Sequence, residues 1–376
     1  MKHLNKIILS GLLATFISIV QATPLTFIFP STIGTAGYTI SSPGLYVLVD
    51  DINFLPTAGG AAITITSTGV TLDLNGKHLF QGNVQASVRG INIVPSVSID
   101  NVVIKNGFID KFTSNGIAGI SINNLEINNV TISGSGTLGL DLTSITVGLI
   151  KDVSVSNNSR GSNFTSCTTV KIINSIFNNN SNASGTQAEG LLSNGSSNFY
   201  VEGCQFNNNN TLISNVYGMS IAGGSNWVVQ NSLFLNNTGL SGTTAGIRCS
   251  NTGCRFINCI ATGNTEFGFV IVGNSNCFES CIAQNNRIGF SISGSSNIFK
   301  NCQAYNSSFL GFGDNVALGD NIYNGCIASK NTTNFTASIL FATWTLSTNA
   351  YTGATAFAAK AAAVDPAFIN NISIVP

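Results

Sequence analysis

Charged residues are scarce in this sequence. Asp, Glu, Lys and Arg make up only 8% of it, about a third of their share in an average soluble domain. The 15 basic and 15 acidic residues also balance, so no net charge attracts a phosphate backbone or anionic lipid. We therefore expect no nucleic-acid partner.

Residues and motifs that commonly carry catalysis are also rare. His78 is the only histidine after the first 22 residues, and no Asp occurs between positions 154 and 313. The sequence has no nucleophile elbow, phosphate-binding loop, EF-hand loop or zinc motif. We predict neither a metal site nor a cofactor.

Long apolar runs are missing except at the start of the chain. Lys2 and Lys6 precede an apolar run over 7–20, and a small-residue cleavage pattern ends at Ala22. The run is too short to span a bilayer comfortably, and no second run of spanning length follows. Residues 1–22 are predicted to be a signal peptide. The mature chain is then secreted or displayed on the cell surface, without a transmembrane anchor.

Glycine recurs at a fixed interval through most of the chain. Repeat glycines can be placed 21 to 29 residues apart, at Gly139, Gly161, Gly190, Gly218, Gly246, Gly268, Gly289 and Gly311. A period in the twenties with variable inserts indicates a solenoid. A leucine-rich repeat would need Leu at fixed sites, and a helical repeat would need a 3.6-residue apolar rhythm. The sequence shows neither, and short alternating pieces such as "GFSIS" and "NIFKN" favour three brief strands per coil.

Aligned coils give columns of equivalent residues. One column is small or apolar: Val130, Val153, Ser175, Cys204, Ser232, Cys259, Cys281, Cys302 and Cys326. Three residues earlier a larger apolar column contains Phe256, Phe278 and Phe299, and both columns are predicted to point inward and stack at the strand spacing. The residue just before the small column is usually Asn, Asp or Gly, types that tolerate a left-handed backbone. We predict that this residue bends each coil. A second Asn cluster, four or five residues after the column, predicts the next bend at Asn236, Asn264, Asn285, Asn306 and Asn331.

With this ladder, the chain resembles the right-handed parallel β-helix proteins of the pectin-lyase-like superfamily. The resemblance covers roughly residues 34–331, and the segments 41–52 and 63–82 look like the entry strands and first coils of such proteins. It implies an all-β fold, a single-stranded right-handed parallel β-helix with three short strands per coil. We place the β-helix at 23–335 and a C-terminal cap or tail at 336–376.

The cysteines and paired charges have structural explanations at this level. The cysteines of the small column are predicted to be buried small hydrophobes rather than metal ligands, because a ladder does not converge on one point. Cys254 and Cys277 lie off the column and form the first pair to test for a disulfide. Glu266 with Arg287, and Glu279 with Lys300, occupy equal registers in successive coils and are predicted to pair.

The resemblance to the superfamily also indicates which catalytic residues to look for. Its lyases hold calcium with clustered acidic residues and use Arg or Lys as base, and its hydrolases use clustered aspartates. Here the aspartates are scattered over the first coils. Asp73, Lys77 and His78 form the best catalytic candidate group, although His78 is better explained as an exposed turn residue than as a general base.

Three coils are longer than the others at the same bend. Their inserts, 178–189, 207–217 and 236–245, are predicted to stack as a wall beside a strand face. Gln187, Glu189, Asn215 and Tyr217 could offer a stacking ring and amide groups to a sugar. Tolerated surface insertions explain the same residues equally well.

Two functions from different classes follow. The first is a non-catalytic carbohydrate-binding or adhesion scaffold, a rod of roughly ten coils and about 50 Å, with an extracellular polysaccharide or cell-surface glycan as its partner. The alternative is a polysaccharide lyase, glycoside hydrolase or epimerase. The missing acidic cluster favours the first.

Overall fold

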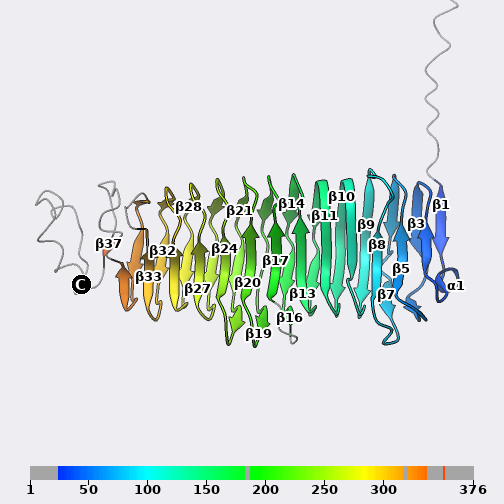
Figure 1. Ribbon diagram of the computed structural model, residues 1–376, viewed down its shortest axis with the longest axis horizontal. Helices are drawn as coiled ribbons and strands as arrows, with labels where there is room; N and C mark the ends of the chain where they lie inside the picture. The colour runs from blue at the N-terminus through cyan, green and yellow to red at the C-terminus, as the bar shows by residue number, and fades with distance from the viewer. Residues whose placement is uncertain (1–23, 183–186, 317–320, 337–349, 352–376) are drawn as a thin grey trace, which may run out of the picture.

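The computed structural model describes residues 24–182, 187–316, 321–336 and 350–351. The predicted signal peptide and the C-terminal cap or tail lie outside the described residues, apart from Thr336 and a two-residue strand, β37 (Ala350–Tyr351). The described chain winds into a rod of about 13 parallel coils. Figure 1 shows the coils side by side along the longest axis, with the short helix α1 (Pro30–Ile33) at the N-terminal end.

Three stacks of parallel strands form the walls of the rod, and nearly every coil contributes a strand to each stack; in the third stack one coil contributes only an isolated bridge at Gln205. Three long strands, β9 (Val102–Asp110), β10 (Ile117–Ser133) and β11 (Leu138–Lys151), pass through more than one stack. Apart from these, the first stack contains β2 (Tyr38–Ile40), β5 (Gly60–Ile65), β8 (Val88–Ile93), β13 (Arg160–Thr165), β17 (Ala188–Asn194), β20 (Val216–Ala222), β24 (Thr244–Cys249), β27 (Phe267–Ile271), β30 (Ile288–Ile292), β33 (Leu310–Asp314) and β36 (Thr333–Phe335).

The second stack contains β1 (Leu25–Ile28), β3 (Gly44–Leu48), β6 (Val70–Asp73), β14 (Val170–Ile173), β18 (Tyr200–Glu202), β21 (Val228–Gln230), β25 (Arg255–Ile257), β28 (Cys277–Glu279), β31 (Ile298–Lys300) and β34 (Ile322–Asn324). The third contains β4 (Ile52–Phe54), β7 (His78–Gln81), β12 (Ser154–Ser156), β15 (Ile176–Asn178), β22 (Leu233–Leu235), β26 (Ile260–Thr262), β29 (Ile282–Gln284), β32 (Gln303–Tyr305) and β35 (Ile327–Ser329), with β37 at its end. The predicted all-β parallel solenoid is therefore confirmed. It has more coils than the roughly ten expected, because the first coils lack the glycine repeat.

The inward columns fill the rod as predicted. Phe278 pairs with Phe299 in register, and their rings stack with centroids 5.0 Å apart. The cysteines of the small column are fully buried, and their thiols donate to backbone carbonyls, as Cys281 Sγ does to Phe256 O at 3.4 Å. All nine cysteines are free thiols, so the bridge suggested between Cys254 and Cys277 is not formed. Cys254 points into the core, whereas Cys277 lies on the partly exposed side of β28.

The predicted bends are confirmed at one corner and corrected at the other. Every member of the column before the small residues has a positive φ: Asn129, Asp152, Asn174, Gly203, Asn231, Asn258, Ser280, Asn301 and Gly325. At the second corner Asn236, Asn285 and Asn306 also have positive φ, but Gly263 and Lys330 take this role in place of Asn264 and Asn331. Asn264 is instead buried among stacked amides.

These buried amides run along the inside of the second corner. Each side-chain amide donates to the carbonyl oxygen of the next, at 2.9–3.2 Å, through Asn158, Asn180, Asn209, Asn237, Asn264 and Asn286. The amide nitrogen also donates to the backbone of the preceding coil, as Asn237 does to Phe206 O at 3.0 Å. The ladder supplies partners for polar groups that no water reaches.

Candidate functional site

The three catalytic candidates do not contact one another through any hydrogen bond or ion pair of the described residues. Asp73 ends β6, where its carboxylate lies 3.5 Å from Lys105 Nζ and accepts from the backbone N–H of Asn75 at 2.8 Å. His78 begins β7, after an intervening turn, and Lys77 forms no ion pair among the described residues. Asp73 and His78 therefore serve different partners and make no common catalytic group.

His78 belongs to a surface cluster that sequence reasoning missed. Its Nδ1 lies 3.2 Å from Asp110 Oδ2, and its ring stacks on Phe108 with centroids 4.3 Å apart. Ser133 donates to the other carboxylate oxygen of Asp110. Strand pairing brings these side chains together, because β7 and β10 flank the end of β9. A 32-residue separation between His78 and Asp110 gave no local signal.

The inserts stack as predicted. A small parallel sheet joins β16 (Ser181–Asn182), β19 (Asn210–Thr211) and β23 (Thr238–Gly239), and β16 and β19 are at the lower edge of the rod in Figure 1. Glu189 and Tyr217 lie next to each other in the pairing of β17 with β20. They are only 1% and 4% exposed, however, so the Tyr217 ring is not available to stack on a sugar.

Glu189 is instead half of a buried ion pair. Arg160 donates from two nitrogens to Glu189 Oε2, at 2.9 and 3.0 Å, while Oε1 is buried and has no partner among the described residues. Burial raises the pKa of Glu189, and the Arg160 charge opposes that rise only in part. Burial likewise raises the pKa of Tyr217.

The other two residues predicted to bind a ligand are partly exposed. Asn215 accepts the backbone N–H of Thr243 at 2.7 Å, which ties two neighbouring inserts together. Gln187 is partly exposed just before β17. Of the four residues predicted to bind a ligand, Glu189 and Tyr217 are buried, and Asn215 and Gln187 are partly exposed. They therefore do not form one open binding surface.

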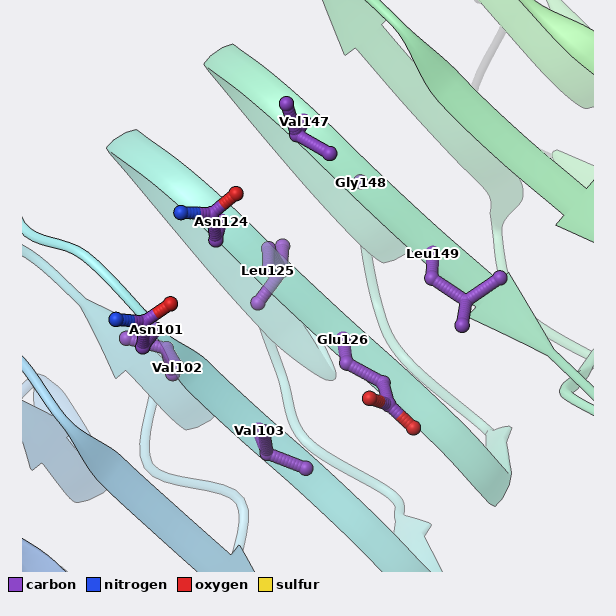
Figure 2. A pocket seen from close by; sticks show the side chains of 9 residues that line it. All are labelled: Asn101, Val102, Val103, Asn124, Leu125, Glu126, Val147, Gly148 and Leu149. Atoms are coloured by element: carbon purple, nitrogen blue, oxygen red, sulfur yellow. The ribbon is translucent and has the colours of Figure 1, made fainter.

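An open hollow occurs on the outer face of the second stack. It has a volume of about 210 Å³. It spans β9, β10 and β11, and Figure 2 shows the side chains that line it. Asn101, Asn124 and Val147 line one side, Val103, Glu126 and Leu149 the other, and Val102, Leu125 and Gly148 lie between them. We call this hollow the outer groove. Glu126 is on the middle strand of the three and accepts from the Asn128 amide at 3.1 Å.

The outer groove combines aliphatic surface with hydrogen-bonding groups of both kinds. The Asn amides donate and accept, and the Glu126 carboxylate accepts. On the N-terminal side of Glu126, the nearest acidic strand residue of the same face is Asp73. It lies two rungs away, about 10 Å along the rod axis, and forms an ion pair with Lys105. Paired carboxylates of glycosidases lie about 5–9.5 Å apart, so this pair is poorly placed for that chemistry. Among the described residues, no three His, Cys, Asp or Glu side chains gather to hold a metal ion.

The two sequence-predicted charge pairs differ. Arg287 pairs with Glu266 at 3.4 Å, as expected. Glu279 pairs with Arg255 of the preceding coil at 3.7 Å rather than with Lys300. No helix in the described part of the chain has the length and apolarity needed to cross a bilayer.

Three kinds of comparison with known proteins were made. A family model described as "Right handed beta helix region" matches residues 180–309. A search of curated proteins with this sequence finds no match. Solved structures of similar shape include the mannuronan C-5 epimerase AlgE4 A-module of Azotobacter vinelandii. It is 11% identical, the match covers 85% of this chain and 100% of the other, and the TM-score is 0.49.

Two further structures are similar in shape. Pectate lyase Pel9A has 14% identity, covers 92% of this chain and 86% of its own, and has a TM-score of 0.46. A polygalacturonase from Erwinia carotovora ssp. carotovora has 12% identity, covers 96% and 100%, and has a TM-score of 0.42. At these identities the likeness concerns the fold alone.

Proposed function

We propose that this parallel β-helix is an exported, non-catalytic carbohydrate-binding rod. The observation that carries this proposal is the outer groove. It is open, it offers amide and carboxylate groups beside aliphatic surface, and the nearest acidic strand residue of the same face toward the N-terminus, Asp73, is paired with Lys105. Such a surface can orient sugar hydroxyls but has no evident means of cleaving a glycosidic bond.

Export would place the rod where polysaccharides are. The leader-like segment 1–22 supports a secreted or cell-surface location, and an extracellular polysaccharide or cell-surface glycan is the partner that fits. Rigidity suits such a role, because each coil fixes the next through continuous strand pairing and stacked side chains.

A glycan array combined with product assays tests this function. We expect the full mature protein to bind at least one glycan class, and Glu126→Gln to weaken that binding about tenfold because the amide removes a charged acceptor. No new reducing ends and no unsaturated products should form. Absence of binding to every glycan would overturn the proposal, and Glu279→Gln, on the same outer face but far along the rod, is the matched control.

The alternative, an enzyme acting on polysaccharide, has one observation in its favour. The pairing of His78 with Asp110 orients a partly exposed imidazole at the start of β7, an arrangement able to move a proton. If the protein is a lyase, hydrolase or epimerase using this pair, product formation will be found and His78→Gln will abolish it. Unchanged activity in His78→Gln would exclude this pair as the catalytic centre.

A further inference from the structure

A second polar cluster lies on the same outer face as the outer groove. Tyr200 Oη donates to Glu202 Oε2 at 2.8 Å, and Gln230 Nε2 contacts both Tyr200 Oη and Glu202 Oε1 at 2.8 Å. The three side chains project from β18 and β21, which are adjacent in the second stack. We call them the tyrosine cluster.

The tyrosine cluster fixes an aromatic ring on an open surface. Tyr200, Glu202 and Gln230 are all only partly buried, so the ring is neither core nor loop. The hydrogen bond from Tyr200 lowers the pKa of Glu202, which keeps the carboxylate charged as an acceptor. An oriented ring beside a carboxylate and an amide can contact the apolar face of a sugar while its hydroxyls are bound.

Strand register places the tyrosine cluster directly in line with the outer groove. Glu126 is paired with Leu149, Leu149 with Lys171, and Lys171 with Tyr200. Three rungs separate Glu126 from Tyr200, about 14 Å along the rod axis. This is farther than one sugar ring reaches, so only an oligosaccharide lying along the axis can touch both.

The charge on this face indicates what kind of glycan fits. From β6 to β18 the outward strand residues carry three acidic and three basic groups: Asp73, Glu126, Glu202, Lys105, Lys151 and Lys171. Asp73 and Lys105 neutralise each other, and Lys151 pairs with Asp152 at 3.6 Å. The face has no excess of positive charge to bind a polymer of uronic acids, and the described residues form no acidic cluster that could bridge through a metal ion.

We propose that this face binds an uncharged polysaccharide lying along the rod axis, with the outer groove and the tyrosine cluster as two separate contact points. The inference rests on the proposed carbohydrate-binding function and adds the ligand's charge class, its direction and a second subsite. Linking two weak contacts through one chain raises affinity, because the second contact forms intramolecularly.

The experiment titrates the mature protein with di-, tetra- and hexasaccharides of neutral glucans, mannans and galactans, and with oligogalacturonates and oligomannuronates. Neutral hexasaccharides should bind about tenfold or more tightly than disaccharides of the same type. Tyr200→Ala should remove that gain while leaving disaccharide binding unchanged, and Tyr200→Phe should remove only part of it. Glu126→Gln should weaken every length.

Tyr305→Ala is the matched control, since Tyr305 is also outward-facing but lies on β32 of the third stack. Thermal unfolding of each variant shows whether it is folded. If Tyr200→Ala does not fold, Gln230→Ala tests the same cluster in its place. If Tyr200→Ala has no effect at any length, the second subsite is wrong and the proposed function stands. If only uronate oligomers bind, the neutral ligand is wrong. If no glycan binds, the proposed function itself fails.

Discussion

At the residue scale, the repeat glycines are needed for close approach rather than for unusual dihedral angles. A Cβ on Gly289 would lie 2.6 Å from Gly311 O in the next coil, and Gly218 and Gly246 have the same relation to their neighbours. None of these three has a positive φ. The glycine column therefore exists because one coil lies directly against the next at that point.

Gly289→Ala should destabilise the rod by about 1–3 kcal/mol, because the added methyl meets backbone that cannot move without disturbing the next coil. Chemical denaturation measures the change. Gly59→Ala is the control, since its Cβ would meet nothing closer than 3.4 Å. Equal effects of the two substitutions would show that close approach is not the reason for the column.

Cysteine reactivity also depends on single positions. Burial raises the pKa of Cys167 and of Cys204 to about 11, and eight of the nine thiols are buried. Only Cys277 is partly exposed. We expect one thiol to react with a thiol reagent in the native protein and nine after denaturation. Cys277→Ser should abolish the native reaction, and persistence of that reaction would show that the core opens.

At the element scale, the buried asparagine ladder joins the coils at one corner. Asn237 accepts from Asn209 at 2.9 Å and donates to Asn264 at 2.9 Å, so it has partners in the coils on both sides. Backbone bonds also join successive coils at this corner, as from Asn236 N–H to Thr262 O at 2.9 Å. The ladder therefore adds side-chain hydrogen bonds to the backbone bonds between coils.

Asn237→Ala should cost about 1–3 kcal/mol, because it leaves the Asn209 amide without its acceptor and opens a buried polar gap. Urea unfolding measures this loss. Asn53, exposed on β4, provides the matched Asn→Ala control. A loss no larger than that of the control would mean that the ladder does not hold the corner.

A second interaction at this scale is the ion pair between Glu189 and Arg160, which joins β17 to β13. Because the folded-state pKa of Glu189 is raised above its ordinary value of 4.5, the protonated form is favoured by folding. Its contribution to stability is fully present below about pH 4.5 and is lost as pH rises through the raised pKa.

Glu189→Gln removes this titration. Relative to wild type, its melting temperature should therefore rise as the pH is increased from about 4 to about 7. Thermal unfolding across that range measures the difference, with the exposed Glu279→Gln as control. A difference that stays constant with pH would contradict the raised pKa of Glu189.

At the scale of the whole molecule, the protein is a neutral rod. Thirteen coils at the strand spacing give a length of about 60 Å. Every wall is a continuous parallel stack, so outer-face residues far apart in sequence form straight lines along the axis. The outer groove and the tyrosine cluster are one such line.

Because the chain has no net charge, ligand binding should depend little on ionic strength. Between about 50 mM and about 500 mM salt we expect less than about a twofold change in the affinity for a neutral glycan. Calorimetric titration in both buffers measures it. A steep loss with salt would indicate a charged ligand and contradict the proposed face.

The sequence by itself determined the solenoid. Residues that repeat at intervals of two dozen positions must fill or turn a coil, so Phe278 over Phe299, the buried cysteines and the left-handed corner from Asn129 to Gly325 could all be read from columns. These features repeat because each coil packs against a neighbouring coil in the same way as the coil before it. The same residue types are therefore needed at the same positions of each repeat, and the sequence shows them as columns.

Only the tertiary structure decided which outward residues meet. The pairing of His78 with Asp110, the contact of Glu279 with Arg255 and the burial of Tyr217 depend on which side chains cross between rungs and what covers them. Outward positions vary freely because solvent imposes no packing requirement. The residues of a surface site therefore cannot be predicted from the sequence pattern. Strand register must first show which of them lie on one line, as it does for Glu126 and Tyr200.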